Sequence, residues 1–425
     1  SFERPPIEYS SAHPTDAIAK LKASIDASQQ TVNRDPSYGY LVGLLDALSI
    51  PVSSQALVYS KTSLQRHRIS PENPRAIYFN DDVYVAWTPD ADLIEIASTD
   101  SRLGSVFYTV DQQQEPTREV EITRRVHRCL FCHGSTDTGR VPGLLMQSVF
   151  TDADGHRAFP SDSIEPKANG PILGRWGGWY VTGTHGSQRH LGNLTTESSE
   201  VVLPDRLEAS TNVNDLSRYF DVTRYLSPHS DLVALLVLQH QVSLHNLFTS
   251  ANHQTLLKLY DGGNNVSDEH TDAEALVDET RIFMDQIAEE IVDGLLMVDQ
   301  TCWSDSMSGS SDFAREFASR GPFDSKGRSL RELDLDRCLF RYPCSYLIYS
   351  DAFDGLPVSV LQRVYARLHA VLHGKDRRAK YRHLSQDQRM AIDEILVATK
   401  PAVAVAFDQL DQAVGEAEES KVDDQ

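Results

Sequence analysis

The stretch AIYFNDDVYVAWTPDADLIEIASTDSRLGSVFYTV, residues 76–110, decides the fold of the N-terminal part of this chain. Short runs of β-branched and aromatic residues alternate there with turn residues at Asn80–Asp82, Pro89 and Asp100–Ser101. β-Branched and aromatic side chains suit a pleated, half-buried surface, and turn residues between such runs favour hairpins. We therefore predict a run of antiparallel strands in which sequential strands are neighbours.

The segments on either side of this run have helical patterning. Before it, apolar residues recur at helical spacing over residues 19–25, and residues 38–48 form a second candidate helix. After it, residues 116–128 have the pattern of a helix that leads into a pair of cysteines, with Pro116 as an early helix residue. Residues 134–193 are rich in glycine and are expected to be mainly loops.

Beyond Ser230 the chain is mostly helical in pattern. Ser230 is the expected N-cap of a helix that is apolar on nearly all sides and therefore buried. Residues 271–298 form an amphipathic helix with an acidic outer face. Further helices are expected over residues 310–321, 356–374 and 384–401, closed by Gly321, Gly374 and Pro401. The expected fold class is α+β and mainly helical, with N-terminal helices, an antiparallel strand run and a C-terminal helical region.

The composition limits the partners of the chain. It has 425 residues and a formal net charge of −21. Its 40% apolar and 24% charged residues are typical of a folded protein. This charge would repel phosphates, so we expect no nucleic-acid partner. No apolar run reaches the ~18 residues of a membrane span, so we expect no transmembrane segment. The acidic end, residues 415–425, has the composition of a solvated, disordered tail.

The segment RCLFCHG, residues 128–134, contains Cys129, Cys132 and His133 in the spacing C-x-x-C-H, which is typical of covalent haem attachment. Each thiol adds to one haem vinyl group, and two intervening residues let a tight turn reach both vinyls. The adjacent histidine then lies under the iron as its proximal ligand. Composition alone would give about 0.002 such motifs in this chain, so chance does not explain it.

Two other kinds of site use paired cysteines. A structural zinc site takes four Cys or His ligands, commonly as two close pairs, and the spacing of Cys338 and Cys344 is loose for a second pair. A thioredoxin-like dithiol needs a βαβ context, which a preceding helix does not provide. With Cys302, these residues leave an odd number of cysteines, and a disulfide between Cys338 and Cys344 is one option in an oxidising compartment.

At the motif the chain resembles the c-type cytochromes. Cys129, Cys132 and His133 match the haem motif, and residues 139–144 are similar to the Gly/Pro-rich loop that follows it in small cytochromes c. More broadly, the chain resembles a family of large single-haem c-type bacterial proteins. The phrases that carry this resemblance are PRAIYFNDDVYVAW, VPGLLMQSVF, RWGGWYVTGTHGSQRHLGNL and RYPCSYLIYSDAFDGLP.

The resemblance implies one covalent haem c that is attached outside the cytoplasm, where the cytochrome maturation machinery works. The expected location is therefore periplasmic or otherwise exported. We accordingly divide the chain into three regions. These are an N-terminal α+β region over residues 1–115, a haem c-binding segment over 116–200, and a helical region with the acidic tail over 201–425.

The group opposite His133 would decide the function. A methionine or second histidine closes the iron for electron transfer, whereas a vacant position permits ligand binding or catalysis. Met146, thirteen residues after His133, is a candidate iron ligand, and the alternative for it is core packing. His185, His190 and His240 are candidate ligands or catalytic acid–base groups. The alternative for His240 is a buried structural histidine on an apolar helix stripe.

The segment RWGGWYVTGTHGSQRH, residues 175–190, is a candidate lining of the haem pocket. Its glycines permit close backbone approach, its aromatic residues offer flat apolar surface, and its arginines suit the haem propionates. The alternative is a glycine-rich strand and loop with surface histidines. Besides the motif, the expected cofactor-binding residues are Arg175, Trp176, Trp179, Tyr180 and Arg189.

Three functions are compatible with one haem in so long a chain. The first is an exported haem oxidoreductase, peroxidase- or oxidase-like, with a vacant distal site and a small-molecule oxidant; the size of the chain favours it. The second is a six-coordinate electron-transfer protein or subunit, whose acidic surface suits a redox partner with a basic docking surface. The third is a haem-based sensor or binding module. The chain differs from the di-haem cytochrome c peroxidases in having one C-x-x-C-H motif.

Overall fold

A six-stranded antiparallel sheet forms the middle layer of the N-terminal half, and its strands follow one another in chain order. The computed structural model describes residues 1–113, 120–158, 172–196, 208, 210–262 and 278–423. The strands are β1 (Ala56–Val58), β2 (Arg75–Phe79), β3 (Val83–Trp87), β4 (Leu93–Asp100), β5 (Gly104–Asp111) and β6 (Ile122–Arg124). The strand run expected over residues 76–110 is confirmed as β2–β5, and the fold is α+β and mainly helical, as expected.

Strand register gives this sheet two different faces. Side chains alternate along each strand, so paired residues form cross-strand rows on one face. One row consists of Ile77, Ala86, Glu95 and Thr109, and the neighbouring row of Tyr84, Ala97 and Phe107. The opposite face carries a wholly different set of side chains, including Tyr78, Val85, Ile96 and Tyr108, which are buried in an apolar cluster.

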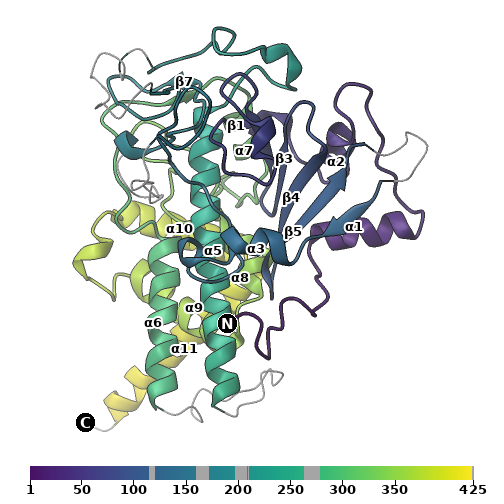
Figure 1. Ribbon diagram of the computed structural model, residues 1–425. Helices are drawn as coiled ribbons and strands as arrows, with labels where there is room; N and C mark the ends of the chain where they lie inside the picture. The colour runs from purple at the N-terminus through teal and green to yellow at the C-terminus, as the bar shows by residue number, and fades with distance from the viewer. Residues whose placement is uncertain (114–119, 159–171, 197–207, 209, 263–277, 424–425) are drawn as a thin grey trace.

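Helices cover both faces of the sheet (Figure 1). α1 (Ala17–Asp26) and α2 (Leu41–Ala47) share an apolar cluster with the second face. α5 (Leu232–Asp261) lies on the first face, where Tyr84 joins the apolar residues of α5 in another cluster. The first face therefore looks toward α5.

α5 is the central helix of the molecule. All residues from Leu232 to Gln241 are buried, as the apolar sequence predicts. Its N-cap is Asp231 and not the expected Ser230, because the Asp231 carboxylate accepts the N–H groups of Val233 and Ala234 at 2.8 and 3.0 Å. Within the described chain, α5 alone is long and apolar enough to cross a membrane, yet most of it is buried inside the protein, as in many core helices.

The C-terminal part is a group of packed helices. α6 runs beside the second half of α5 in Figure 1, and α9 packs against both α6 and α11. The helices are α6 (Asp278–Leu295), α7 (Phe313–Ala318), α8 (Asp351–Asp354), α9 (Val358–Leu372), α10 (Gln386–Thr399) and α11 (Pro401–Asp423). They confirm the expected helices of this half; the first part of one, residues 271–277, lies outside the described residues.

Short elements connect these parts. β7 (Gly183–Thr184) pairs with β8 (Ser308–Gly309) and so ties the glycine-rich segment to the C-terminal half. The 3₁₀ turns are Val52–Ser54, Arg66–Arg68, Thr136–Thr138, Ile172–Gly174, Val222–Arg224, Tyr346–Tyr349 and Ala379–Tyr381.

A further local prediction, besides the Ser230 N-cap, is wrong. Where a helix was expected before the cysteines, Ile122–Arg124 instead pairs with β5 as strand β6, and Pro116 lies outside the described residues. The helix is formed by the motif itself, as α3 (His127–His133). α10 ends at Thr399, just before Pro401 as expected, and Pro401 begins α11, which extends to Asp423.

Candidate functional site

The C-x-x-C-H motif forms helix α3, which brings its three chemical groups to one side. Cys129, Cys132 and His133 occupy positions i, i+3 and i+4, which are neighbours on a helix surface. β6 leads the chain into α3, and there the Arg125 N–H donates to the Phe107 carbonyl at 2.8 Å. The motif is therefore fixed beside the edge of the sheet.

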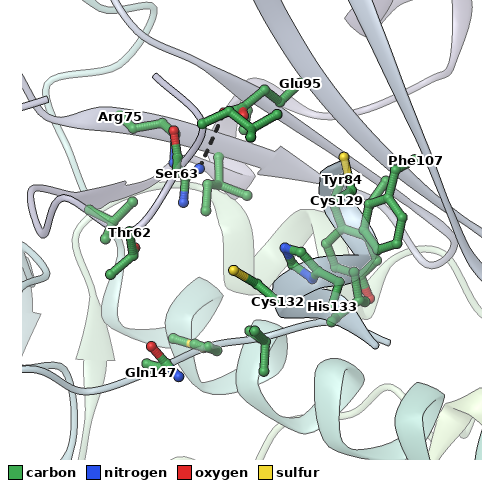
Figure 2. Close-up of a pocket in the computed structure, with 18 of the residues that line it drawn as sticks. Thr62, Ser63, Arg75, Tyr84, Glu95, Phe107, Cys129, Cys132, His133 and Gln147 are labelled. Carbon is green, nitrogen blue, oxygen red and sulfur yellow. Dashed lines mark hydrogen bonds and ion pairs between the residues drawn. The ribbon is translucent and has the colours of Figure 1, made fainter. Parts of the chain in front are cut away.

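These three side chains line a cavity of about 600 Å³. This volume lies within the range of roughly 300–1,000 Å³ that is usual for cofactor and small-molecule sites. The two cross-strand rows of the first sheet face line one side, and Leu238 and Val242 of α5 line another. Figure 2 shows Cys132 and His133 projecting from α3 toward the open centre, with Arg75 and Glu95 across from them.

His133 is held by one ring nitrogen. Its Nδ1 lies 2.9 Å from the Gly143 carbonyl, and because a carbonyl only accepts, Nδ1 carries the proton. Nε2 is then the nitrogen with a free lone pair, which is the form that binds a metal. Burial lowers the pKa of His133, so the ring is neutral at physiological pH. The Phe107 ring, 4.7 Å away between centroids, supports its orientation.

The Gly143 carbonyl is itself held in place. The Gly143 N–H donates back to the His133 carbonyl at 2.8 Å. The Asn246 side chain of α5 bonds both the N–H and the carbonyl of Leu144, each at 2.8 Å. A Cβ atom on Gly143 would lie 2.5 Å from Asn246 Oδ1, so the close approach requires glycine. α5 thus positions His133 through this loop.

The two motif cysteines are free thiols. All five cysteines of the chain are unpaired, so the disulfide considered between Cys338 and Cys344 is not formed. Burial, with the nearby Glu95 charge, raises the pKa of Cys129 to about 11. A redox dithiol needs an easily ionised thiol, which Cys129 is not. Cys338, whose pKa burial and Asp334 raise to about 12, does not line the cavity and adds no fourth ligand.

The cavity is cationic although the chain as a whole is strongly acidic. Among the described residues, its lining contains five cationic side chains and two carboxylates, Glu95 and Asp137. The cationic residues are Lys61, Arg66, Arg75, Arg128 and Arg157. Arg75 and Glu95, both largely buried, form an ion pair at 3.3 Å. The remaining positive charge suits a ligand that carries carboxylates.

Met146, a candidate iron ligand from the sequence, lies in the wall of the cavity. It is 7% exposed and belongs to the cavity lining together with Leu144 and Leu145. The Trp179 indole N–H donates to the Gln147 carbonyl at 2.8 Å and so fixes the adjacent backbone. Within the described lining, Met146 and His133 are the only methionine and histidine.

The structure does not bring the predicted histidines His185 and His190 to the motif. Neither lines the cavity. Their rings lie 4.8 Å apart between centroids in a separate buried cluster, where Trp176 packs edge-on against His190. His185 Nε2 accepts the Asn212 N–H, and His190 Nδ1 accepts the Gly192 N–H. Their expected place at the distal side of the motif is therefore incorrect.

Of the other residues expected from the glycine-rich segment, only Trp179 lines the cavity. Arg175 is buried beside α5, where its guanidinium donates to Gln239 Oε1 at 3.3 Å. Arg189 bonds the Ser187 carbonyl in its own loop. The Tyr180 hydroxyl donates to the Pro71 carbonyl at 2.8 Å. These contacts, like the burial of Trp176, stabilise the core and the loops and do not form part of the cavity wall.

His240 also has a structural role. Its Nε2 lies 2.7 Å from the Ser345 hydroxyl, and Phe340 packs edge-on against its ring. Leu238 and Val242, which share a helix face at i and i+4, line the cavity, whereas His240 does not. The structural alternative is therefore the correct one for His240.

Sequence reasoning missed the sheet residues of the site. Arg75, Glu95 and Phe107 line the cavity because they occupy the first face of their strands. The sequence shows how side chains alternate between the two faces of each strand, but it does not show which face of the sheet lies toward the motif. Gly143 lies in the Gly/Pro-rich loop that the sequence indicated, whereas Asn246 had no local signal, since it contacts Leu144 from 102 residues away.

Comparison of the chain with protein-family models, with curated proteins and with solved structures found no match in any of the three.

Proposed function

We propose that this chain is a c-type cytochrome that holds one haem c in the cavity beside α3. Cys129 and Cys132 would form the thioether bonds, and His133 Nε2 would be the proximal iron ligand. The observation that carries the proposal is the hydrogen bond from His133 Nδ1 to the Gly143 carbonyl at 2.9 Å. It leaves Nε2 free on the same helix face as two unpaired thiols, beside a cavity of cofactor size.

The residues that line the cavity are suited to hold a haem c. The thiols are unpaired, the imidazole is neutral, and the excess of cationic side chains suits two propionates. When bound, a haem c supplies a one-electron couple between ferric and ferrous iron. Gly143 orients the imidazole and, through the hydrogen bond, increases its basicity. The apolar walls from α5 and the sheet limit access of water.

Met146 would supply a second ligand to the iron, which would make the protein an electron carrier. It is the one methionine in the described lining, and no second histidine lies there. The peroxidase- or oxidase-like alternative relied on His185, His190 and His240 as acid–base groups, and these lie elsewhere. The electron-transfer alternative is therefore the better supported of the two.

The proposed partner is a redox protein with a basic docking surface outside the cytoplasm. The net charge of −21 would attract such a surface. Phe131, between the motif cysteines, is 87% exposed at the rim of the cavity.

The test is expression of the full chain together with a cytochrome c maturation system. Haem that stays with the polypeptide on a denaturing gel, at about one equivalent per chain, is the expected result. The ferrous protein should show a low-spin spectrum that carbon monoxide leaves unchanged. Absence of covalent haem would refute the cofactor, whereas a covalent haem that binds carbon monoxide would refute only the part assigned to Met146.

A further inference from the structure

A second histidine cluster lies at the other end of the molecule, where α9 meets α11. His369 and His373 are four residues apart at the end of α9, with ring centroids 4.0 Å apart. Asp411 of α11 reaches the same place, and His369 Nε2 donates to its Oδ1 at 2.9 Å. One ligand atom from each of the three residues lies within 4.8 Å of the others.

The spacing of these atoms is close to that of a metal site. Zinc bonds of ~2.0–2.2 Å to nitrogen and oxygen in tetrahedral geometry place ligand atoms roughly 3.3 Å apart. Small side-chain shifts of about 1 Å would bring the three atoms to that distance. The proton that His369 now shares with Asp411 would be replaced by the metal ion, as imidazole ligation requires.

The neighbouring residues hold the imidazoles in place. His373 Nε2 donates to the Asp393 carboxylate of α10 at 3.1 Å, which leaves Nδ1 as the free nitrogen of this ring. A carboxylate on the second nitrogen is the usual support of a metal-bound histidine. Phe407 of α11 packs edge-on against both rings, at 5.1 and 6.1 Å between centroids. The side chain of His369 is 4% exposed, so its position is set by packing.

We propose that His369, His373 and Asp411 bind one divalent transition-metal ion of the zinc kind, with Asp393 as a positioning residue. Two imidazoles and one carboxylate are ligands that such ions prefer, and a fourth position would remain for water. Asp411 is about half exposed, so an ion can enter from solvent.

The ion would fasten α11 to α9. Asp411 lies on the terminal helix, and the two histidines lie 42 and 38 residues earlier in the chain. Binding to the folded protein alone stabilises it, and the free energy of unfolding rises with the logarithm of the ligand concentration above Kd. This role is independent of the cavity beside α3.

The experiment is titration of Zn²⁺ into the full chain after removal of metals with a chelator. Zinc content after desalting, measured separately from iron, should be about one equivalent, and zinc should raise Tm. Replacing both motif cysteines, Cys129→Ser and Cys132→Ser, should leave this equivalent in place, which separates the site from the motif.

His369→Ala, His373→Ala and Asp411→Asn should each weaken zinc binding about 10-fold or more. Two control variants should bind zinc as the wild type does. One is Asp408→Asn, on the same helix as Asp411. The other is His383→Gln, because both ring nitrogens of His383 bond backbone carbonyls. Asp411 is at the surface, so its variant should fold normally and show the loss without a change in circular dichroism.

Failure of the wild-type chain to retain zinc would overturn the proposal. So would an Asp411→Asn protein that folds and binds zinc as the wild type does.

Discussion

The His133 site and the His369–His373 site fix an imidazole in the same way but surround it differently. In each, a protein acceptor holds one ring nitrogen: the Gly143 carbonyl for His133 and the Asp393 carboxylate for His373. Beyond the ring, His133 borders a cavity of about 600 Å³, whereas the C-terminal histidines border each other and a carboxylate. A large cavity suits a planar cofactor, and a closed set of donors suits a bare ion. The surroundings therefore distinguish the two sites more than the histidines do.

The strongest test of this comparison removes His133, the proposed proximal ligand. His133→Ala should abolish the wild-type iron spectrum, because it deletes the proposed proximal ligand, and should leave zinc binding unchanged. His127→Gln, an exposed position on the same helix, is the matched control. Absorption spectra and metal content of both variants test this prediction. A wild-type spectrum in His133→Ala would contradict the assignment of His133 as the iron ligand.

A second test concerns the other axial position. Met146→Leu keeps the volume of the side chain but removes its sulfur, so the iron should become able to bind carbon monoxide. Met307→Leu, at a buried methionine outside the cavity lining, should not have this effect. If neither variant binds carbon monoxide while the wild-type spectrum persists, Met146 is a packing residue.

Acid should destabilise the protein through histidines that belong to neither site. Burial lowers the pKa of His240 and of His190 to about 3. The folded pKa lies below the unfolded value, so the unfolded chain takes up protons first, and stability is lost as the pH falls from about 6.5 toward 3. Each such group costs up to about 1.4 kcal/mol per pH unit in that window.

His240→Gln should therefore lose less stability than the wild type between pH 7 and pH 5 in chemical denaturation. Asp82, whose pKa burial raises to about 7, acts in the opposite direction in both proteins, so the difference between them isolates His240. Equal pH dependence in the two proteins would contradict the buried, neutral assignment.

The smallest expected effect tests how α5 positions the proximal histidine. Asn246→Ala should lower stability by about 1–2 kcal/mol, because it removes two hydrogen bonds to Leu144. Asn252→Ala, which removes another α5 side-chain bond to backbone, at the Ser101 carbonyl, should cost a similar amount. Only Asn246→Ala should raise the midpoint potential, since it weakens support of the His133 imidazole.

The sequence predicted the fold better than the site. Strands β2–β5 and the main helices follow from local periodicity, which is a property of each segment alone. β6 was missed because a three-residue strand depends on its partner, here β5, more than on its own composition. The motif was found because its chemistry is encoded in five consecutive residues.

The remaining walls of the cavity could not be predicted, because they meet only through long-range packing. The glycine-rich segment 175–190 had suitable residues, yet β7 pairs with β8 and holds much of it away from the motif. Met146 and Trp179 reach the cavity, but His185 and His190 do not. Chemical suitability of a segment does not determine which site it joins.

The outward position of the motif has a consequence for the order of assembly. Cys132 is exposed and Phe131 almost fully so, while the sheet and α5 form the deeper walls. If the chain holds a haem c, an attachment enzyme could thus reach the Cys132 thiol without unfolding the layers behind it, whereas the Cys129 thiol is partly buried. On this basis, haem attachment would begin at Cys132.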